Sequence, residues 1–151
     1  DNALLAAALK KDVEAKGLTF SDEYITKVCG LIKEKISFIK ELWETGSYFF
    51  VHPTTYDETV IAKRWTEKSP LVLQDMIQAV LGNAEFSHAT FEAAYNEALT
   101  KNGVSNKEFL QLLRVCLSGV AGGPPIFEMA ELFGKEVTLQ RLQAALDNIN
   151  K

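Results

Sequence analysis

The sequence lacks the residue sets that metal centres, phosphate loops and common hydrolase sites require. Its two histidines, His52 and His88, have no second histidine at ligand spacing, and no Cys-x-x-Cys pair or calcium-loop pattern occurs. A Gly-x-x-x-x-Gly-Lys-Ser/Thr loop and a Gly-x-Ser-x-Gly turn are also absent. These absences argue against a metal site, a nucleotide-phosphate loop and a serine-hydrolase centre, and we expect this chain to hold no cofactor.

Long apolar runs and cysteine are scarce as well. No apolar stretch approaches the length of a membrane span, and the first residues alternate Ala and Leu with Lys and Asp, unlike a secretory signal. The two cysteines, Cys29 and Cys116, lie far apart in apolar helical patterns. Buried free thiols in a reducing, cytoplasmic setting are the favoured interpretation, with a disulfide as the alternative. Because the chain opens at Asp1 without a methionine, we expect it to come from a longer protein.

Positive charge is limited and unevenly distributed. The formal net charge is −4, which argues against a general polyanion binder whose affinity rests on phosphate neutralisation. Residues 69–100 hold four acids and no lysine or arginine, whereas residues 101–151 hold six bases and five acids. If RNA is a partner, we therefore expect it to avoid the middle segment and to use the C-terminal one.

The apolar periodicity is helical throughout and predicts an all-α chain of about seven to eight helices. Phe109, Leu112, Leu113 and Cys116 illustrate it, at positions i, i+3, i+4 and i+7. The predicted helices cover 2–16, 21–45 with a break near Gly30, 56–66, 70–81, 87–101, 105–118, 125–133 and 135–150. Linker composition predicts two subdomains, 1–68 and 69–151.

Local signals support the helix limits. Ser21, Ser87 and Ser105 each follow an apolar residue and precede another at hydrophobic-staple spacing, and Glu108 completes a capping box with Ser105. A glycine follows most of the helical runs, as expected at a helix C-terminus. The run at 49–51, Phe-Phe-Val, is expected to fill the core, with a short strand as the alternative.

One segment has the composition of a site. A helical run ends at Gly119, a loop holding two glycines and two prolines follows, and a new helix opens with Ile126 and Phe127. Such a loop presents backbone N–H groups and apolar side chains at a helix N-terminus, which suits a flat apolar ligand or a base. A plain tight corner between two helices is the alternative.

The same segment carries a family resemblance. Its motifs are Arg114-Val115-Cys116-Leu117-Ser118-Gly119, Gly123-Pro124-Pro125-Ile126-Phe127-Glu128 and Phe133-Gly134-Lys135-Glu136. A second patch agrees, with Leu42-Trp43, Tyr48-Phe49-Phe50-Val51, Tyr56-Asp57 and Lys63-Arg64-Trp65. These motifs resemble the C-terminal anticodon-binding region of bacterial-type glutamyl-tRNA synthetases from about residue 20 onward.

The resemblance implies a function in recognition. It implies that this piece reads the anticodon loop of tRNA(Glu), while the parent enzyme joins glutamate to that tRNA with ATP and Mg²⁺. The family's two catalytic motifs, of the His-Ile-Gly-His and Lys-Met/Leu-Ser-Lys types, are missing here. We therefore expect no aminoacylation by this chain alone, an N-terminal catalytic domain in the parent as its second partner, and neither membrane nor DNA binding.

The resemblance also assigns residues. It implies anticodon contacts from Arg114, Gly123, Pro124, Ile126 and Phe127, with Arg114 as the leading base reader. Lys135, Lys63 and Arg64 are candidate phosphate contacts. Each assignment has a structural alternative: a pairing or capping role for Arg114, a core position for Phe127 and for Ile126, and a solvated lysine at 135.

Two further points stay open at this stage. The family often reads the wobble base with a basic residue in the helix that holds Lys33 and Lys35, and the alignment does not fix which position does so. Cys116 and Ser118 stand where Ala and Thr are common in the family that the chain resembles. The pair at 122–123, Gly-Gly, supplies less side-chain hydrogen bonding than relatives with Thr in this loop, which leaves one base contact open. The rival hypothesis is a helical protein–protein interaction module with an acidic surface and no RNA binding.

Overall fold

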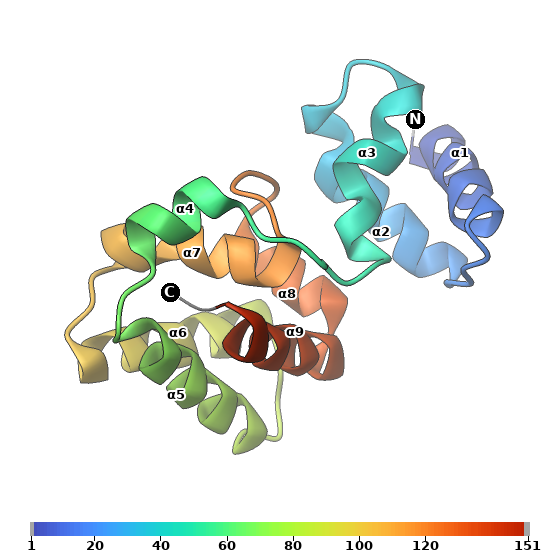
Figure 1. Cartoon of the computed structure of the whole chain (residues 1–151). Helices are drawn as coiled ribbons and strands as arrows, with labels where there is room; N and C mark the ends of the chain where they lie inside the picture. The colour runs from blue at the N-terminus through green and yellow to red at the C-terminus, as the bar shows by residue number, and fades with distance from the viewer. Residues whose placement is uncertain (1, 150–151) are drawn as a thin grey trace. The chain divides into compact units, whose positions relative to one another are not determined.

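The computed structural model describes residues 2–149, which form nine α-helices and three short 3₁₀ helices without a strand among them (Figure 1). The predicted all-α class is therefore confirmed. No helix in the described range is both long and apolar enough to cross a membrane. Cys29 and Cys116 are free and buried, as predicted.

The chain divides into two compact units between His52 and Pro53. The sequence placed the boundary later, near residue 68. The difference arises because the helix at Glu58–Arg64 packs against the helix at Asn106–Ser118, so residues 53–68 join the C-terminal unit.

The N-terminal unit is a small bundle of α1 (Asn2–Ala15), α2 (Asp22–Ile32) and α3 (Leu42–Gly46), which pack against one another. The 3₁₀ helices η1 (Lys33–Lys35), η2 (Ile39–Glu41) and η3 (Ser47–Phe49) connect or extend them. The core side chains are Leu9, Val13, Ile25, Val28, Cys29, Ile32, Leu42, Phe49 and Phe50. Ser21 begins α2 by accepting a hydrogen bond from the amide of Tyr24, as its cap position predicts.

The helix predicted over 21–45, with a break near Gly30, is interrupted in the structure at another point. Gly30 lies inside α2, and the interruption falls later, between η1 and α3. Ile36 and Phe38 both have extended backbone, with ψ of 150° and 146°. The Glu41 carboxylate accepts hydrogen bonds from the amides of Ser37 and Phe38, which fixes the chain outside the helix at this point.

The aromatic run at 49–51 fills the core in part, as predicted. Phe49 and Phe50 are buried, and the ring of Phe50 lies edge-on to Phe20 and Tyr24. Val51, by contrast, is exposed because the chain is already leaving the unit there. The strand alternative is not realised, since Phe49 ends a 3₁₀ helix.

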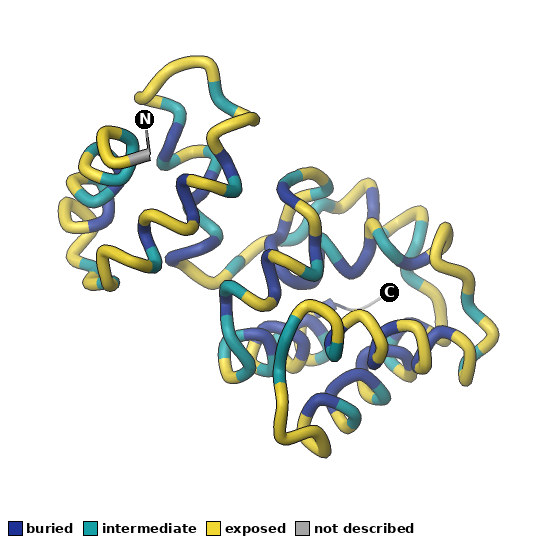
Figure 2. Tube along the Cα trace, turned by 180° about the vertical axis from the view of Figure 1, so that it is seen from behind, coloured by how far each residue is buried: buried dark blue, intermediate teal, exposed yellow. Residues whose placement is uncertain are grey.

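The C-terminal unit holds the remaining helices. They are α4 (Glu58–Arg64), α5 (Ser69–Leu81), α6 (His88–Asn102), α7 (Asn106–Ser118), α8 (Ile126–Phe133) and α9 (Lys135–Asn148). Helix α7 packs against α4, α8 and α9, while α5 lies against α6 and α9. Every residue from 115 to 119 is buried, so the end of α7 is part of the core of the unit. Buried and exposed stretches alternate along the helices, as Figure 2 shows.

The helix limits follow the predicted signals closely in this unit. Ser87 and Ser105 cap α6 and α7 through their side chains, and the Glu108 carboxylate accepts a hydrogen bond from the amide of Ser105. Gly103 and Gly119 end these helices with left-handed backbone. The last helix was predicted to reach residue 150. The structure ends it at Asn148, and residue 150 lies outside the described range.

Candidate nucleic-acid interface

The loop at 119–125 is held by the end of α7, and Gly119 is the pivot. Its φ of +85° is a left-handed conformation that an L side chain resists. Its carbonyl accepts the amide of Asp57 at 3.0 Å. A Cβ at this position would lie 2.8 Å from the carbonyl oxygen of Thr55 and 3.0 Å from Cβ of Pro53. Glycine is therefore required both by the backbone angle and by the close approach of residues 53–57.

Ser118 closes the first turn of the loop. Its Oγ donates to the carbonyl of Arg114 at 2.8 Å and accepts the amide of Val120 at 3.3 Å. The hydroxyl thus satisfies backbone groups that the helix end leaves without partners. The serine that departs from the family's usual threonine still supplies the hydroxyl that the turn uses.

Arg114 braces the far side of the same loop. Its side chain is half-buried, and one terminal nitrogen donates to the carbonyl of Pro124. This acceptor is a loop carbonyl, neither an acid nor the end of α7, so the base-contact and the pairing or capping interpretations of Arg114 both stay predictions. A guanidinium is a planar fork of five N–H donors, a group suited to hydrogen-bonding several acceptors at once.

The turn into α8 presents some predicted residues and hides others. Ile126 is only 3% exposed, so it supports the turn from the core. A core position was the structural alternative for Ile126. Pro124 is buried, whereas Pro125 is exposed. Phe127 is half-buried, with ring centroids 5.4 Å from Tyr95 and 6.0 Å from Phe91. Phe127 therefore sits at the edge of the core with part of its side chain accessible.

Val120 and Arg141 also lie at or near the loop, although the sequence did not single them out. Val120 is 46% exposed on the loop, beside the exposed Gly122. Arg141, on α9, is buried to 2% exposure, donates to the carbonyl of Leu117 at 2.8 Å and lies 4.1 Å from the ring centre of Phe133. No sequence signal distinguishes Arg141 from a solvated helix cation. It nevertheless anchors the end of α7, on which the loop is built.

The candidate phosphate contacts do not gather around the loop. Lys135 donates to the carbonyl of Asn83 at 2.8 Å, which ties the start of α9 to the segment after α5. Lys63 is exposed near the end of α4, and Arg64 is half-buried with its Nε enclosed. Since α4 begins beside Gly119 and rises about 1.5 Å per residue, Arg64 lies roughly 10 Å along the unit from the loop.

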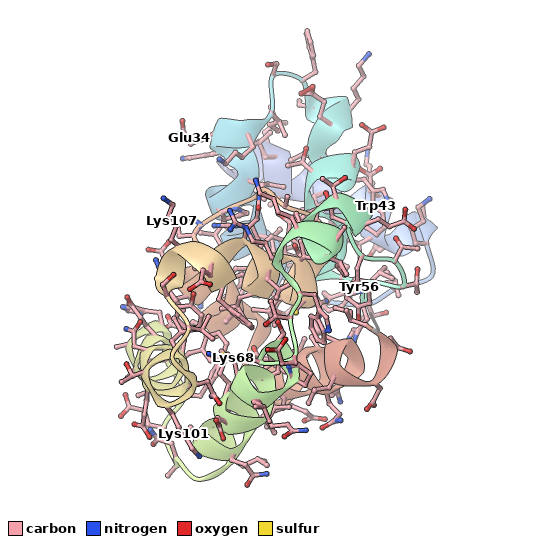
Figure 3. The ribbon with its side chains drawn as sticks, turned by 60° about the vertical axis from the view of Figure 1, so that its left-hand side comes forward. Glu34, Trp43, Tyr56, Lys68, Lys101 and Lys107 are labelled. Carbon is pink, nitrogen blue, oxygen red and sulfur yellow. The ribbon has the colours of Figure 1, made fainter. Side chains whose placement is uncertain are left out.

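Glu108 lies in the first turn of α7, at the end of the helix away from the loop. The pKa of this carboxyl is lowered, first by the backbone amide of Ser105 and then by the Ser105 side chain, with smaller contributions from Lys68 and Arg64. Lys68 precedes α5, and Lys101, which ion-pairs with Asp75 at 3.2 Å, lies in the last turn of α6 (Figure 3). These cations are therefore engaged by acids and helix ends within the unit.

The buried titratable groups beneath the loop are held neutral. Burial raises the pKa of the Cys116 thiol to about 12, and it raises the pKa of the Tyr95 hydroxyl, which donates to Asn106 Oδ1 at 2.9 Å. Among residues 2–149, no three His, Cys, Asp or Glu side chains cluster so as to hold a metal ion. The loop therefore combines a hydrogen-bonded turn with a partly accessible ring at Phe127 and a guanidinium at Arg114.

The comparisons with known proteins agree with this arrangement. The family model described as the anticodon binding domain matches residues 4–146. The chain belongs to the anticodon binding domain family.

The relatives within that family are glutamate–tRNA ligases. One from Flavobacterium johnsoniae is 34% identical over 146 residues, and one from Porphyromonas gingivalis is 31% identical over 147. Each alignment takes in 97% of this chain but 29% of the relative. The chain therefore spans less than a third of the length of these relatives.

Solved structures give the same family. A glutamate tRNA ligase from Elizabethkingia meningosepticum, solved in complex with its amino acid, superposes with a TM-score of 0.87 at 26% identity, covering 99% of this chain and 30% of that one. A second, from Elizabethkingia anophelis, gives a TM-score of 0.79 at 25% identity. The resemblance stated from the sequence motifs is confirmed.

Proposed function

We propose that this chain recognises the anticodon loop of tRNA(Glu) as the anticodon-binding part of a glutamate–tRNA ligase. The observation that carries the proposal is the match of nearly the whole chain, residues 4–146, to the anticodon binding domain family. In this account the complete ligase uses ATP and Mg²⁺ in a separate catalytic domain, acts in the cytoplasm, and takes its selectivity partly from the residues described here.

The loop at 119–125 is the proposed base-reading surface. Unstacked bases are recognised in general by stacking on rings and by hydrogen bonds to their edges. The accessible part of Phe127 and the exposed ring of Pro125 offer an apolar platform, and the Arg114 fork donates to the carbonyl of the neighbouring Pro124. Gly123, with φ of +135°, allows the backbone to turn closely there. Ile126 acts in this account only by supporting the turn.

The residues around the loop contribute to binding by fixing the conformation of the loop in advance. The loop is tied at Gly119 to Asp57, at Ser118 to Val120 and at Pro124 to Arg114. A surface that is already ordered loses less conformational entropy when a ligand binds, so more of the stacking energy appears as affinity. Lys63 is the exposed cation that we propose for a backbone phosphate, and such a contact is sequence-independent.

The proposal is tested with an anticodon stem-loop RNA in which each anticodon base is changed in turn. We expect at least one change to weaken binding by roughly 1–3 kcal/mol, the discrimination typical of one good base contact. The matched control is the same set of changes in a stem base pair, with pairing preserved. Equal binding of all anticodon variants by a folded chain would overturn the proposal.

A further inference from the structure

One aromatic side chain in the N-terminal unit has no role in its core. Phe38 is 64% exposed, the highest value among the large apolar side chains of the described residues, and its neighbour Ile39 is 47% exposed. Phe38 has extended backbone between η1 and η2, and Ile39 is the first residue of η2. The other eight phenylalanines of the sequence are buried or half-buried.

The backbone that carries Phe38 is fixed. Glu41 Oε2 accepts the amides of Ser37 at 2.6 Å and of Phe38 at 2.9 Å, and the Phe38 carbonyl accepts the amide of Glu41 at 3.0 Å. The pKa of Glu41 is lowered, first by the amide of Phe38 and then by that of Ser37. The Glu41 carboxylate therefore holds the backbone from which the Phe38 side chain projects.

Three lysines lie close to Phe38 in the sequence, and one of them lies over its ring. Lys33, Lys35 and Lys40 are exposed in the same stretch, and the Lys40 Nζ lies 5.7 Å from the centre of the Phe38 ring. The acids of the stretch are Glu34, exposed on η1, and Glu41, whose carboxylate is occupied by the two amides. The segment therefore combines a rigid aromatic face with a net positive local charge, although the whole chain is acidic.

We propose that Phe38 is a second base-stacking position, which holds an unstacked nucleobase of the bound RNA while Lys33, Lys35 and Lys40 contact its phosphates. Aromatic rings interleaved with cations are the recurring device for binding single-stranded nucleic acid. A protein partner would require a broader apolar patch, whereas here two apolar side chains stand among three lysines. The inference rests on the proposed function, because it takes the ligand to be the same RNA.

The test is binding of the full chain to the anticodon stem-loop, with 2-aminopurine placed at each loop position in turn. This fluorescent base is quenched when it stacks. We expect one position to be quenched by the wild-type chain, and Phe38→Ala to remove that quenching and to weaken binding by about 5- to 150-fold. Phe38→Trp should restore both, because it keeps an aromatic face.

Two controls separate the explanations. Phe38→Leu keeps an apolar side chain without a ring, and it should behave like Phe38→Ala. Leu81→Ala removes an apolar side chain of similar exposure, 56%, from the other unit and should change nothing. If Phe38→Leu binds like the wild type, the contact is apolar docking and the stacking proposal is overturned.

Failure of this inference is distinguishable from failure of the proposed function. If the wild-type chain prefers the native anticodon while Phe38→Ala binds as tightly and quenches as well, only the role of Phe38 is overturned. If the wild-type chain binds no stem-loop, or binds every anticodon equally, the recognition function fails and the role of Phe38 fails with it.

Discussion

At the scale of single residues, the candidate site is built from side chains that also hydrogen-bond the 119–125 loop. Arg114 donates to the Pro124 carbonyl, and Ser118 closes the turn through its hydroxyl. A residue with two roles gives mixed results when it is truncated, because stability and recognition change together. Predictions at this scale therefore need a measurement that separates discrimination from affinity.

Arg114→Ala should reduce the preference for the native anticodon by roughly 1–3 kcal/mol, because one planar fork is lost. The measurement is the ratio of dissociation constants for native and changed stem-loops. Arg114→Lys is the matched variant: it keeps the charge but not the fork, so it should recover overall affinity better than discrimination. Retention of full discrimination by Arg114→Ala would remove this residue from the reading surface.

Gly119→Ala should destabilise the chain by about 1–3 kcal/mol or more, since it forces a side chain into left-handed backbone. The added Cβ would also meet the Thr55 carbonyl at 2.8 Å. Gly122→Ala is the control on the same loop, because nothing lies within 4 Å of its added Cβ, and it should stay within about 0.5 kcal/mol of the wild type. Urea unfolding measures both; equal effects would contradict the account of the pivot.

At the scale of elements, two charged side chains hold the segments that carry the 119–125 loop and Phe38. Arg141 joins α9 to the last carbonyls of α7, and Glu41 holds the extended segment before α3. Neither role follows from helix periodicity, because both residues read as solvated charges in the sequence. Substitutions at Arg141 and Glu41 therefore test how these parts of the fold are held in place.

Arg141→Ala should cost about 1.5–3 kcal/mol or more, because a charged hydrogen bond to the Leu117 carbonyl is lost from a buried position. Gln140→Ala, on the exposed side of the same helix, is the control and should be nearly neutral. Thermal unfolding of the two variants gives the comparison. A small effect of Arg141→Ala would mean that α9 does not anchor the end of α7.

The hydrogen bonds that Glu41 accepts from Ser37 and Phe38 should weaken at low pH. Its pKa is lower in the folded chain than in the unfolded one, so its contribution is complete above the ordinary glutamate value of about 4.3 and is lost as pH falls through the lower folded value. Amide exchange protection of Ser37 and Phe38 should fall in that acidic window. Glu41→Gln should abolish the pH dependence of this protection, and an unchanged profile in that variant would show that another group controls it.

At the scale of the whole molecule, the sequence predicted the helices better than the surfaces. Capping serines and helix-ending glycines are local signals, and Ser105 and Gly119 bounded α7 correctly because caps act within a few residues. The interruption before α3 was misplaced because the Glu41 clamp is a side-chain interaction with no fixed sequence pattern. The burial of Ile126 and the tie between Lys135 and Asn83 depend on tertiary packing, which periodicity does not encode.

A salt series separates recognition of bases by this chain from a general attraction of RNA. Dissociation constants for tRNA(Glu) and for the same tRNA with a changed anticodon are measured between about 50 and 200 mM salt. Phosphate contacts weaken equally for both RNAs as salt rises, whereas base contacts are nearly independent of salt. The account predicts that both affinities fall while their ratio persists. A ratio that falls to one as salt rises, or that is one at every salt concentration, would contradict it.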